Sequence, residues 1–213
     1  MALHDILYGL LIGVIGGGAS GLMGVSSGGF LVALVVMMLG LPQHVAQGVS
    51  LVAQVPPTSL SGVMQYRRSG HVVSARWVAW LSAGFVAGAI AGALLAGLIA
   101  EDVLRWAFVG YLALLGLLSL TRLRGTHEKA ERPAVVLGAA TLFGVGIVSG
   151  LSSGLLGIGG GLAITALLAA ALKVPQHVSQ ALALAVTTLP LTFPAAWVYA
   201  TQEHGLPWLA IAA

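Results

Sequence analysis

The sequence predicts an all-α polytopic membrane protein with two inverted repeats of transmembrane helices, in which short or broken helices meet near the membrane midplane. Three observations lead to this prediction: few charges, long uncharged windows and an internal repeat. Only 7% of the 213 residues are charged and 58% are hydrophobic, whereas a soluble domain carries about 25% charge. So few charges cannot cover a folded protein of this size in water, which excludes a soluble globular enzyme, a nucleic-acid binder and a disordered chain.

Long stretches of the chain contain no Asp, Glu, Lys or Arg. About 20 apolar residues cross a bilayer core as a helix, so these stretches hold roughly eight passes or part-passes. The uncharged windows are residues 6–66, 77–100, 106–121, 133–172 and 174–202.

Helix positions follow from these windows and from the prolines and glycines that interrupt them. Aromatic residues next to charged loops, such as Tyr66, Trp77, Trp106 and Tyr199, are interpreted as interfacial anchors. The predicted helices lie near residues 5–23, 28–41, 43–66, 75–99, 103–121, 134–153, 161–173 and 176–200, with a ninth beginning near Leu206.

The internal repeat appears when the sequence is shifted by 133 residues. The shift aligns Gly21-Leu22-x-Gly24-x3-Gly28 with Gly154-Leu155-x-Gly157-x3-Gly161, and Pro42-Gln43-His44-Val45-x-Gln47 with Pro175-Gln176-His177-Val178-x-Gln180. Without any gap it also pairs Tyr66 with Tyr199. Because the matched residues include Gln, His, Pro and Tyr, chance matching in an apolar sequence does not explain the repeat.

An odd number of helical segments between Tyr66 and Tyr199 turns the second copy upside down, as in many secondary transporters. The short segments 28–41 and 161–173 are the open point, because at about 21 Å each they could be re-entrant and change the parity. The predicted units are a first transmembrane repeat (1–120), a basic linker (121–133) and a second repeat (134–213) that is expected to be incomplete at its carboxyl end.

Basic residues gather in two loops, residues 67–76 and 121–133. This asymmetry predicts that both loops are cytoplasmic and that the protein is a multi-pass protein of the cytoplasmic (inner) membrane. The net charge of +3 is read as this orientation signal and not as a nucleic-acid surface. The chain has no cysteine, so no disulfide or thiolate metal site is predicted, and the first apolar segment lacks the basic start of a cleaved signal peptide.

One helix carries a polar stripe. After Pro42, polar side chains recur at steps of three or four residues, and in lipid such a stripe faces the bundle interior or a cavity. The stripe contains Gln43, Gln47, Ser50, Gln54, Thr58, Ser61 and Gln65, and its copy keeps Gln176, Gln180 and Thr187. We expect Gln47, Ser50, Gln54, Gln180 and Thr187 to line a substrate site; the alternative is that they only bond neighbouring helices.

Prolines fall in the middle of both copies of this helix. Pro56 and Pro57 in the first copy, and Pro190 and Pro194 in the second, predict helix breaks near the midplane. Broken helices expose backbone groups that transporters use to hold substrates and ions. A proline kink without any ligand is the alternative.

Glycine-rich turns at residues 24–29 and 157–161 each precede a short helix. Helix amino termini with free N–H groups favour anions, which makes Ser26, Ser27, Gly28, Gly160 and Gly161 candidate anion-binding residues. The alternative is that these glycines permit close helix packing. We interpret a second small-residue series, Gly84-x3-Gly88-x3-Gly92, as helix packing.

No acidic residue lies inside an apolar span. A cation substrate would need a counter-charge, whereas an anion held by amides and helix dipoles would not. His44 and His177 begin equivalent helices and are candidates for pH sensing or gating. No metal site and no cofactor are predicted.

An alternative interpretation is an intramembrane protease. Gly18-Ala19-Ser20-Gly21 matches the Gly-x-Ser-Gly motif of rhomboid proteases, with His177 as the base.

Several of these motifs together resemble the TauE/SafE sulfite exporter family over essentially the whole chain. They are the duplicated Gly-x3-Gly, Pro42 with Ala46, Ser50-Leu51, Tyr66-x3-Gly70 and the glycine series from Gly84. The resemblance implies a permease of the cytoplasmic membrane for small anions such as sulfite, sulfoacetate and related organosulfur or organic anions. The direction, export, is implied by the resemblance alone.

The expected function is therefore a secondary transporter that exports small anions, and not an enzyme. A channel-like passive anion pore and a non-transporting intramembrane enzyme or scaffold are the alternatives. The expected partners are the anion and the lipid bilayer, with a coupling ion (proton or sodium) and a homo-oligomer as open partner classes and no nucleic acid.

Overall fold

A computed structural model describes residues 9–18, 28–56, 59–70, 73–124 and 137–201 of the chain. All regular structure within these ranges is helical. This agrees with the predicted all-α class, and most of the predicted helices occur within a few residues of their expected positions.

The described part of the first half contains a helix over Gly9–Gly18 and five further helices. These are α2 (Gly28–Leu39), α3 (Gln43–Ala53), α4 (Leu60–Arg68), α5 (Ala75–Ala96) and α6 (Glu101–Arg124). The second half contains α7 (Ala139–Leu156), α8 (Gly160–Ala166) with a π-helical extension η1 (Leu167–Ala171), α9 (Gln176–Thr188) and α10 (Phe193–Thr201). The predicted basic linker over 121–133 begins inside α6, and its remainder lies outside the described residues.

Two of the described helices, α5 and α7, are each long and apolar enough to cross a bilayer. The pair α9 and α10 meets the same criteria together, with a bend of 50° between its two members. Several apolar helices are therefore compatible with a membrane protein, as the composition predicts.

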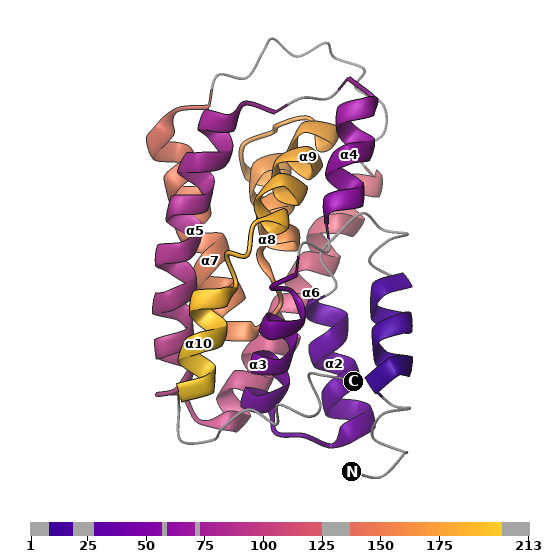
Figure 1. Cartoon of the computed structure of the whole chain (residues 1–213), viewed down its shortest axis with the longest axis vertical. Coiled ribbons are helices and arrows are strands. Elements are labelled where there is room, and N and C mark those ends of the chain that lie inside the picture. The colour runs from indigo at the N-terminus through magenta and orange to yellow at the C-terminus, as the bar shows by residue number, and fades with distance from the viewer. Residues whose placement is uncertain (1–8, 19–27, 57–58, 71–72, 125–136, 202–213) are drawn as a thin grey trace.

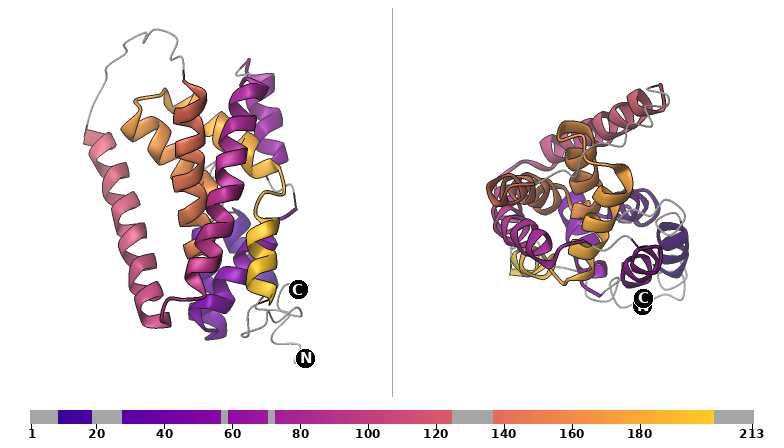
Figure 2. Two further views of the ribbon diagram at one scale, coloured as in Figure 1. Left: turned by 90° about the vertical axis from the view of Figure 1, so that its left-hand side faces the viewer. Right: turned by 90° about the horizontal axis from the view of Figure 1, so that it is seen from above.

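Helices α5 and α7 approach each other more closely than they could if larger residues replaced the glycines at their contact. A Cβ atom on Gly84, Gly88 or Gly92 would collide with a backbone carbonyl of α7, and one on Gly146 or Gly150 would collide with a carbonyl of α5. The contacting residues increase together along both helices, so α5 and α7 run parallel, and both views of Figure 2 show them side by side. The predicted packing role of the glycine series from Gly84 is confirmed, with a matching series on α7.

The two predicted proline-broken helices are each divided into two separate helices. Figure 1 shows α3 in the lower half of the molecule and α4 in the upper half, whereas α9 lies in the upper half and α10 in the lower half. The chain therefore runs upward through α3 and α4 and downward through α9 and α10.

Prolines mark both interruptions. Pro56 lies between α3 and α4, and Pro190 lies between α9 and α10. Leu189, just before Pro190, has an extended backbone (φ −78°, ψ 144°), as expected for a residue preceding proline. Pro194 differs from its prediction, because it lies in the first turn of α10, where a proline costs no hydrogen bond. Pro57 lies outside the described residues.

Candidate functional site

The polar face of α3 is buried inside the molecule, together with Gln54, which directly follows the helix. Gln47 and Ser50 are 0% exposed, and Gln43 and Gln54 are 4% and 6% exposed. A buried polar side chain needs hydrogen-bond partners, so the contacts of these four residues define the candidate site.

The polar stripe does not continue into α4 as predicted. Ser61 and Gln65 are exposed, and Thr58 lies outside the described residues. The interruption between Ala53 and Leu60 resets the rotation of the chain, so a period counted along one continuous helix no longer applies. Gln176, the counterpart of the buried Gln43, is also exposed.

Ser50 joins the glycine turns of both halves of the chain. Its Oγ lies 3.1 Å from the carbonyl oxygen of Gly28 and 2.8 Å from that of Gly157. The Gln54 side-chain amide donates to the Ser50 carbonyl (2.9 Å) and to its Oγ (3.1 Å). Because a hydroxyl has one proton, Ser50 donates to one of the two glycine carbonyls at a time.

These contacts depend on glycine. A Cβ atom on Gly28 would collide with the Ile158 carbonyl, and Gly157 has φ +67° and lies against the backbone of Gln47. The amino end of α2 and the turn before α8 therefore meet next to α3. Gly160 and Gly161 are buried at the start of α8, and Gly160 lies against the Phe85 ring, where a Cβ would collide with ring atoms.

Gln47 bonds to a tyrosine of the other half of the chain. The Tyr199 hydroxyl lies 3.0 Å from Gln47 Oε1 and 2.9 Å from the Gly154 carbonyl. Gln47 Nε2 is buried and has no hydrogen-bond partner among the described residues. An unpaired amide donor in a dry interior is costly, so Gln47 Nε2 is a candidate for contact with a ligand.

A second tyrosine–glutamine pair lies between α4 and α9. The Tyr66 hydroxyl donates to Gln180 Oε1 at 2.6 Å, and Thr187 Oγ1 lies 3.0 Å from Ser59 Oγ. Gln180 and Thr187 are half-buried. Each tyrosine thus bonds to the glutamine that precedes the other tyrosine, and the two pairs are related by the 133-residue shift.

Both tyrosines were missed as site residues by the sequence reasoning. The interpretation of Tyr199 as an interfacial anchor is wrong, because Tyr199 is 3% exposed and its hydroxyl points into the core contacts described above. Its neighbour Trp197 is 60% exposed. The signal that could have found the tyrosines was the repeat itself, which preserves Tyr together with Gln in an otherwise apolar sequence.

Several candidates lie at helix starts away from the tyrosine–glutamine pairs, or outside the described residues. His44 is half-buried and His177 is exposed, each as the second residue of its helix, α3 or α9. Ser26, Ser27 and the Ser20 of the protease alternative lie outside the described residues. The described residues hold no group of three or more His, Cys, Asp or Glu side chains that could bind a metal.

A family model described as sulfite exporter TauE/SafE matches residues 8–213. The chain belongs to the TauE/SafE family. It is also similar to a protein named probable membrane transporter protein YdhB from Bacillus subtilis (strain 168), with 33% identity over 155 residues. That match covers 72% of this chain and 59% of the relative, so the chain spans about three fifths of the relative's length. No solved structure matches the chain.

Membership of the TauE/SafE family agrees with the apolar helices described above. The family description and the relative's name both indicate a membrane transporter. Within this TauE/SafE chain, the polar groups at the contacts of α3, α4, α9 and α10 are the candidates for contact with a transported molecule.

Proposed function

We propose that this TauE/SafE-family chain works as a secondary transporter that exports small anions, such as sulfite, sulfoacetate or related organosulfur and organic anions, across the cytoplasmic membrane. The observation that carries the proposal is the crossed pair of hydrogen bonds, Tyr199 to Gln47 and Tyr66 to Gln180. These bonds connect the two halves of the chain at equivalent positions, which suits interrupted helices that move relative to one another.

An inverted repeat accounts for this crossing. Helices α3 and α4 run in the opposite direction to α9 and α10 in Figure 1, and the two sets are related by the 133-residue shift. A two-fold relation in the membrane plane exchanges the two halves, and with them the two tyrosine–glutamine pairs. Substrate sites of transporters with inverted repeats lie at the interface of the repeats.

The donor chemistry of this interface suits an anion. The Gln47 Nε2 donor has no partner among the described residues, and Ser50 and Gln54 lie one and two helical turns further along α3. The backbone N–H groups at the starts of α2 and α8, near Gly28, Gly160 and Gly161, add partial positive charge. The only carboxylates among the described residues are Glu101 and Asp102, at the start of α6.

A mostly apolar pocket borders this site at Ser50. It has a volume of about 290 Å³, lies between the Gly9–Gly18 helix, α2 and α3, and includes Ser50 in its lining. A volume of this size has room for a sulfite-sized anion and several waters, since one water occupies about 30 Å³ of liquid.

Alternating access follows if the two tyrosine–glutamine pairs open in turn. Movement of the interrupted helices beside the close α5–α7 contact, which joins the two halves, would break one tyrosine–glutamine pair and keep the other. We place the 67–76 and 121–133 loops in the cytoplasm because of their basic residues.

The test is sulfite flux into proteoliposomes that contain the full chain, with an imposed pH gradient or membrane potential as a variable. We expect saturable flux, and we expect the double variant Gln47→Ala/Gln180→Ala to lose at least about tenfold of it, since two hydrogen-bond donors of about 1 kcal/mol each are removed. The control is Gln65→Ala, an exposed glutamine of α4, which should retain flux.

Each alternative has its own signature in this assay. Flux that rises linearly with sulfite concentration would indicate a passive anion pore. Unchanged flux in the double variant would disprove the site while leaving transport intact, and wild-type flux equal to that of empty liposomes would disprove the transport proposal.

A further inference from the structure

A second pocket lies next to the Tyr66–Gln180 pair, away from Ser50. It has a volume of about 230 Å³ and is bordered by α4, α5 and α9. Most of its lining is small and apolar, including Val63, Val78 and Ala181, and its two polar side chains are Tyr66 and Arg67. The lining therefore combines one full positive charge with one hydroxyl.

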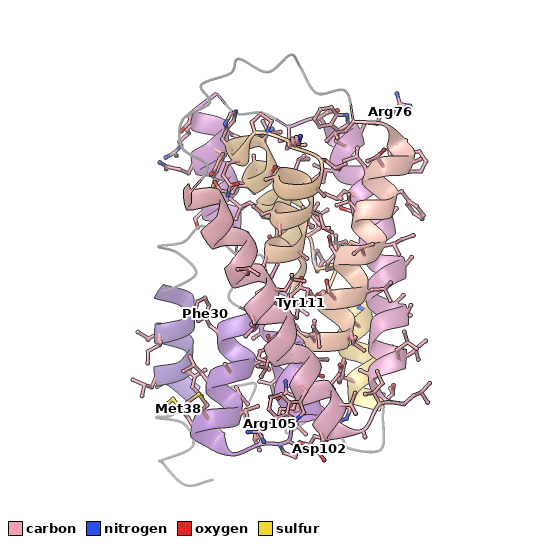
Figure 3. The ribbon with its side chains drawn as sticks, turned by 180° about the vertical axis from the view of Figure 1, so that it is seen from behind. Phe30, Met38, Arg76, Asp102, Arg105 and Tyr111 are labelled. Atoms are coloured by element: carbon pink, nitrogen blue, oxygen red, sulfur yellow. The ribbon has the colours of Figure 1, made fainter. Side chains whose placement is uncertain are left out.

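This pocket lies at the positively charged end of the described molecule. Arg67 and Arg68 belong to the last turn of α4, and Arg76 is the second residue of α5 at the same end. Figure 3 shows Arg76 at one end and Asp102 at the opposite end. Glu101 lies beside Asp102 at the start of α6, so both described carboxylates are far from the pocket. Charge of one sign around a cleft with apolar walls raises the local concentration of counter-ions.

We infer that this pocket is a docking site for the small anion before it reaches the centre, with Arg67 as the charged ligand and the Tyr66 hydroxyl as the hydrogen-bond donor. The inference rests on the proposed anion transport and adds a second site to it. The ligand class is one compact oxyanion or organosulfonate, because the guanidinium and hydroxyl suit oxygen acceptors and the pocket holds roughly seven water volumes of about 30 Å³ each.

Binding of an anion in this pocket would break the hydrogen bond between Tyr66 and Gln180 at its edge. Tyr66 has one hydroxyl proton, and the structure assigns it to Gln180 Oε1 at 2.6 Å. A docked anion that accepts this proton removes the Tyr66 donor from Gln180. Occupancy of the pocket thereby releases a bond between α4 and α9, which belong to different halves of the chain.

Arg67 and Arg68 provide a matched pair for the experiment. Both are exposed arginines of the last turn of α4, and only Arg67 lines the pocket. Arg67→Gln and Arg68→Gln therefore remove the same charge from adjacent positions, and each change weakens the favourable interaction with the helix carboxyl terminus to a similar degree.

Two readouts are measured for each variant: the half-saturating sulfite concentration in proteoliposomes, and equilibrium binding of radiolabelled sulfite to the purified full chain in detergent. We expect Arg67→Gln to raise the half-saturating and dissociation constants about five- to tenfold, the range for a charge-assisted contact at a partly solvated site. The maximal flux should change little, and Arg68→Gln should change both constants less than about twofold.

The outcomes separate docking from transport. Equal effects of the two substitutions, or no effect of Arg67→Gln in a chain that transports sulfite, would overturn the docking site while the transport proposal stands. Binding that depends on Arg67 in a chain without flux would support the docking site and overturn transport. Absence of sulfite binding by the wild-type chain would overturn the docking site outright.

Discussion

The α5–α7 pair and the interrupted helices hold the molecule together in different ways. Along α5 and α7, glycines let each backbone touch the other, and the contact repeats every four residues from Gly84 to Gly92. Between α3, α4, α9 and α10, the halves are connected by side-chain hydrogen bonds, which include those from Tyr66, Tyr199 and Thr187. The first contact is continuous and fixed by shape, and the second is made of separable bonds.

Because of this difference, we expect the α5–α7 contact to be rigid and the contacts of the interrupted helices to be exchangeable. A contact in which a Cβ would meet backbone atoms cannot be rearranged by rotating a side chain, so α5 and α7 move as one body. A hydroxyl–amide bond costs about 1 kcal/mol to exchange for another partner, so the interrupted helices can part and rejoin. Three predictions test this contrast, from the largest expected effect to the smallest.

Gly146→Ala should break the fixed contact. Its Cβ would collide with the Leu81 carbonyl of α5, and overpacking of this kind costs about 1–3 kcal/mol or more. The measurement is equilibrium unfolding of the purified protein in mixed micelles. Gly144→Ala is the control on the same helix, because a Cβ there meets nothing within 4 Å. If both variants lost the same stability, the glycine contact would not be the cause.

Tyr199→Phe and Tyr66→Phe should lower the free energy of unfolding by different amounts. Tyr199 is 3% exposed, so loss of its single hydroxyl proton leaves either the Gln47 or the Gly154 oxygen short of a donor in a dry site, at about 1–2 kcal/mol. Tyr66 is half-buried and borders the pocket, so water replaces its hydroxyl at a cost of about 0.5 kcal/mol. The same unfolding measurement compares them. A larger loss for Tyr66→Phe would reverse the ranking and contradict the contrast between the buried and the accessible pair.

Glu101→Gln should have the smallest effect. The Glu101 carboxylate accepts a hydrogen bond of 2.8 Å from the backbone N–H of Gln43 at the start of α3, where a negative charge is favourable. The amide oxygen of Gln still accepts a hydrogen bond but carries no charge. We therefore expect the free energy of unfolding to fall by about 0.5 kcal/mol, and this loss to shrink at high salt. Asp102→Asn is the neighbouring control. A loss that does not respond to salt would exclude the electrostatic explanation.

The sequence predicted the helices well because their signals are local. Uncharged windows set their lengths, and Pro42, Pro56, Pro175 and Pro190 set the ends and interruptions of the repeated helices. The glycine series on α5 was also readable as a packing surface. The helix that packs against this surface was not predictable, because a small-residue surface fits any other small-residue surface. Only the folded chain shows that this helix is α7.

The candidate site was predictable only in part. The spacing of Gln47, Ser50 and Gln54 placed them correctly on one buried face, since α3 is a regular helix up to Ala53. The same spacing failed for Ser61 and Gln65, because the interruption changes the direction of the chain. Tyr66 and Arg67 looked like boundary and orientation signals, and their shared pocket depends on α5 and α9, which are distant in sequence.

The glycine contact between α5 and α7 also restricts how these helices can slide. Gly84, Gly88 and Gly92 lie against three successive carbonyls of α7, at Phe143, Ile147 and Leu151. A displacement by four residues, about 6 Å, would again place glycines against carbonyls. The glycine spacing therefore favours registers of α5 and α7 that differ by whole four-residue steps.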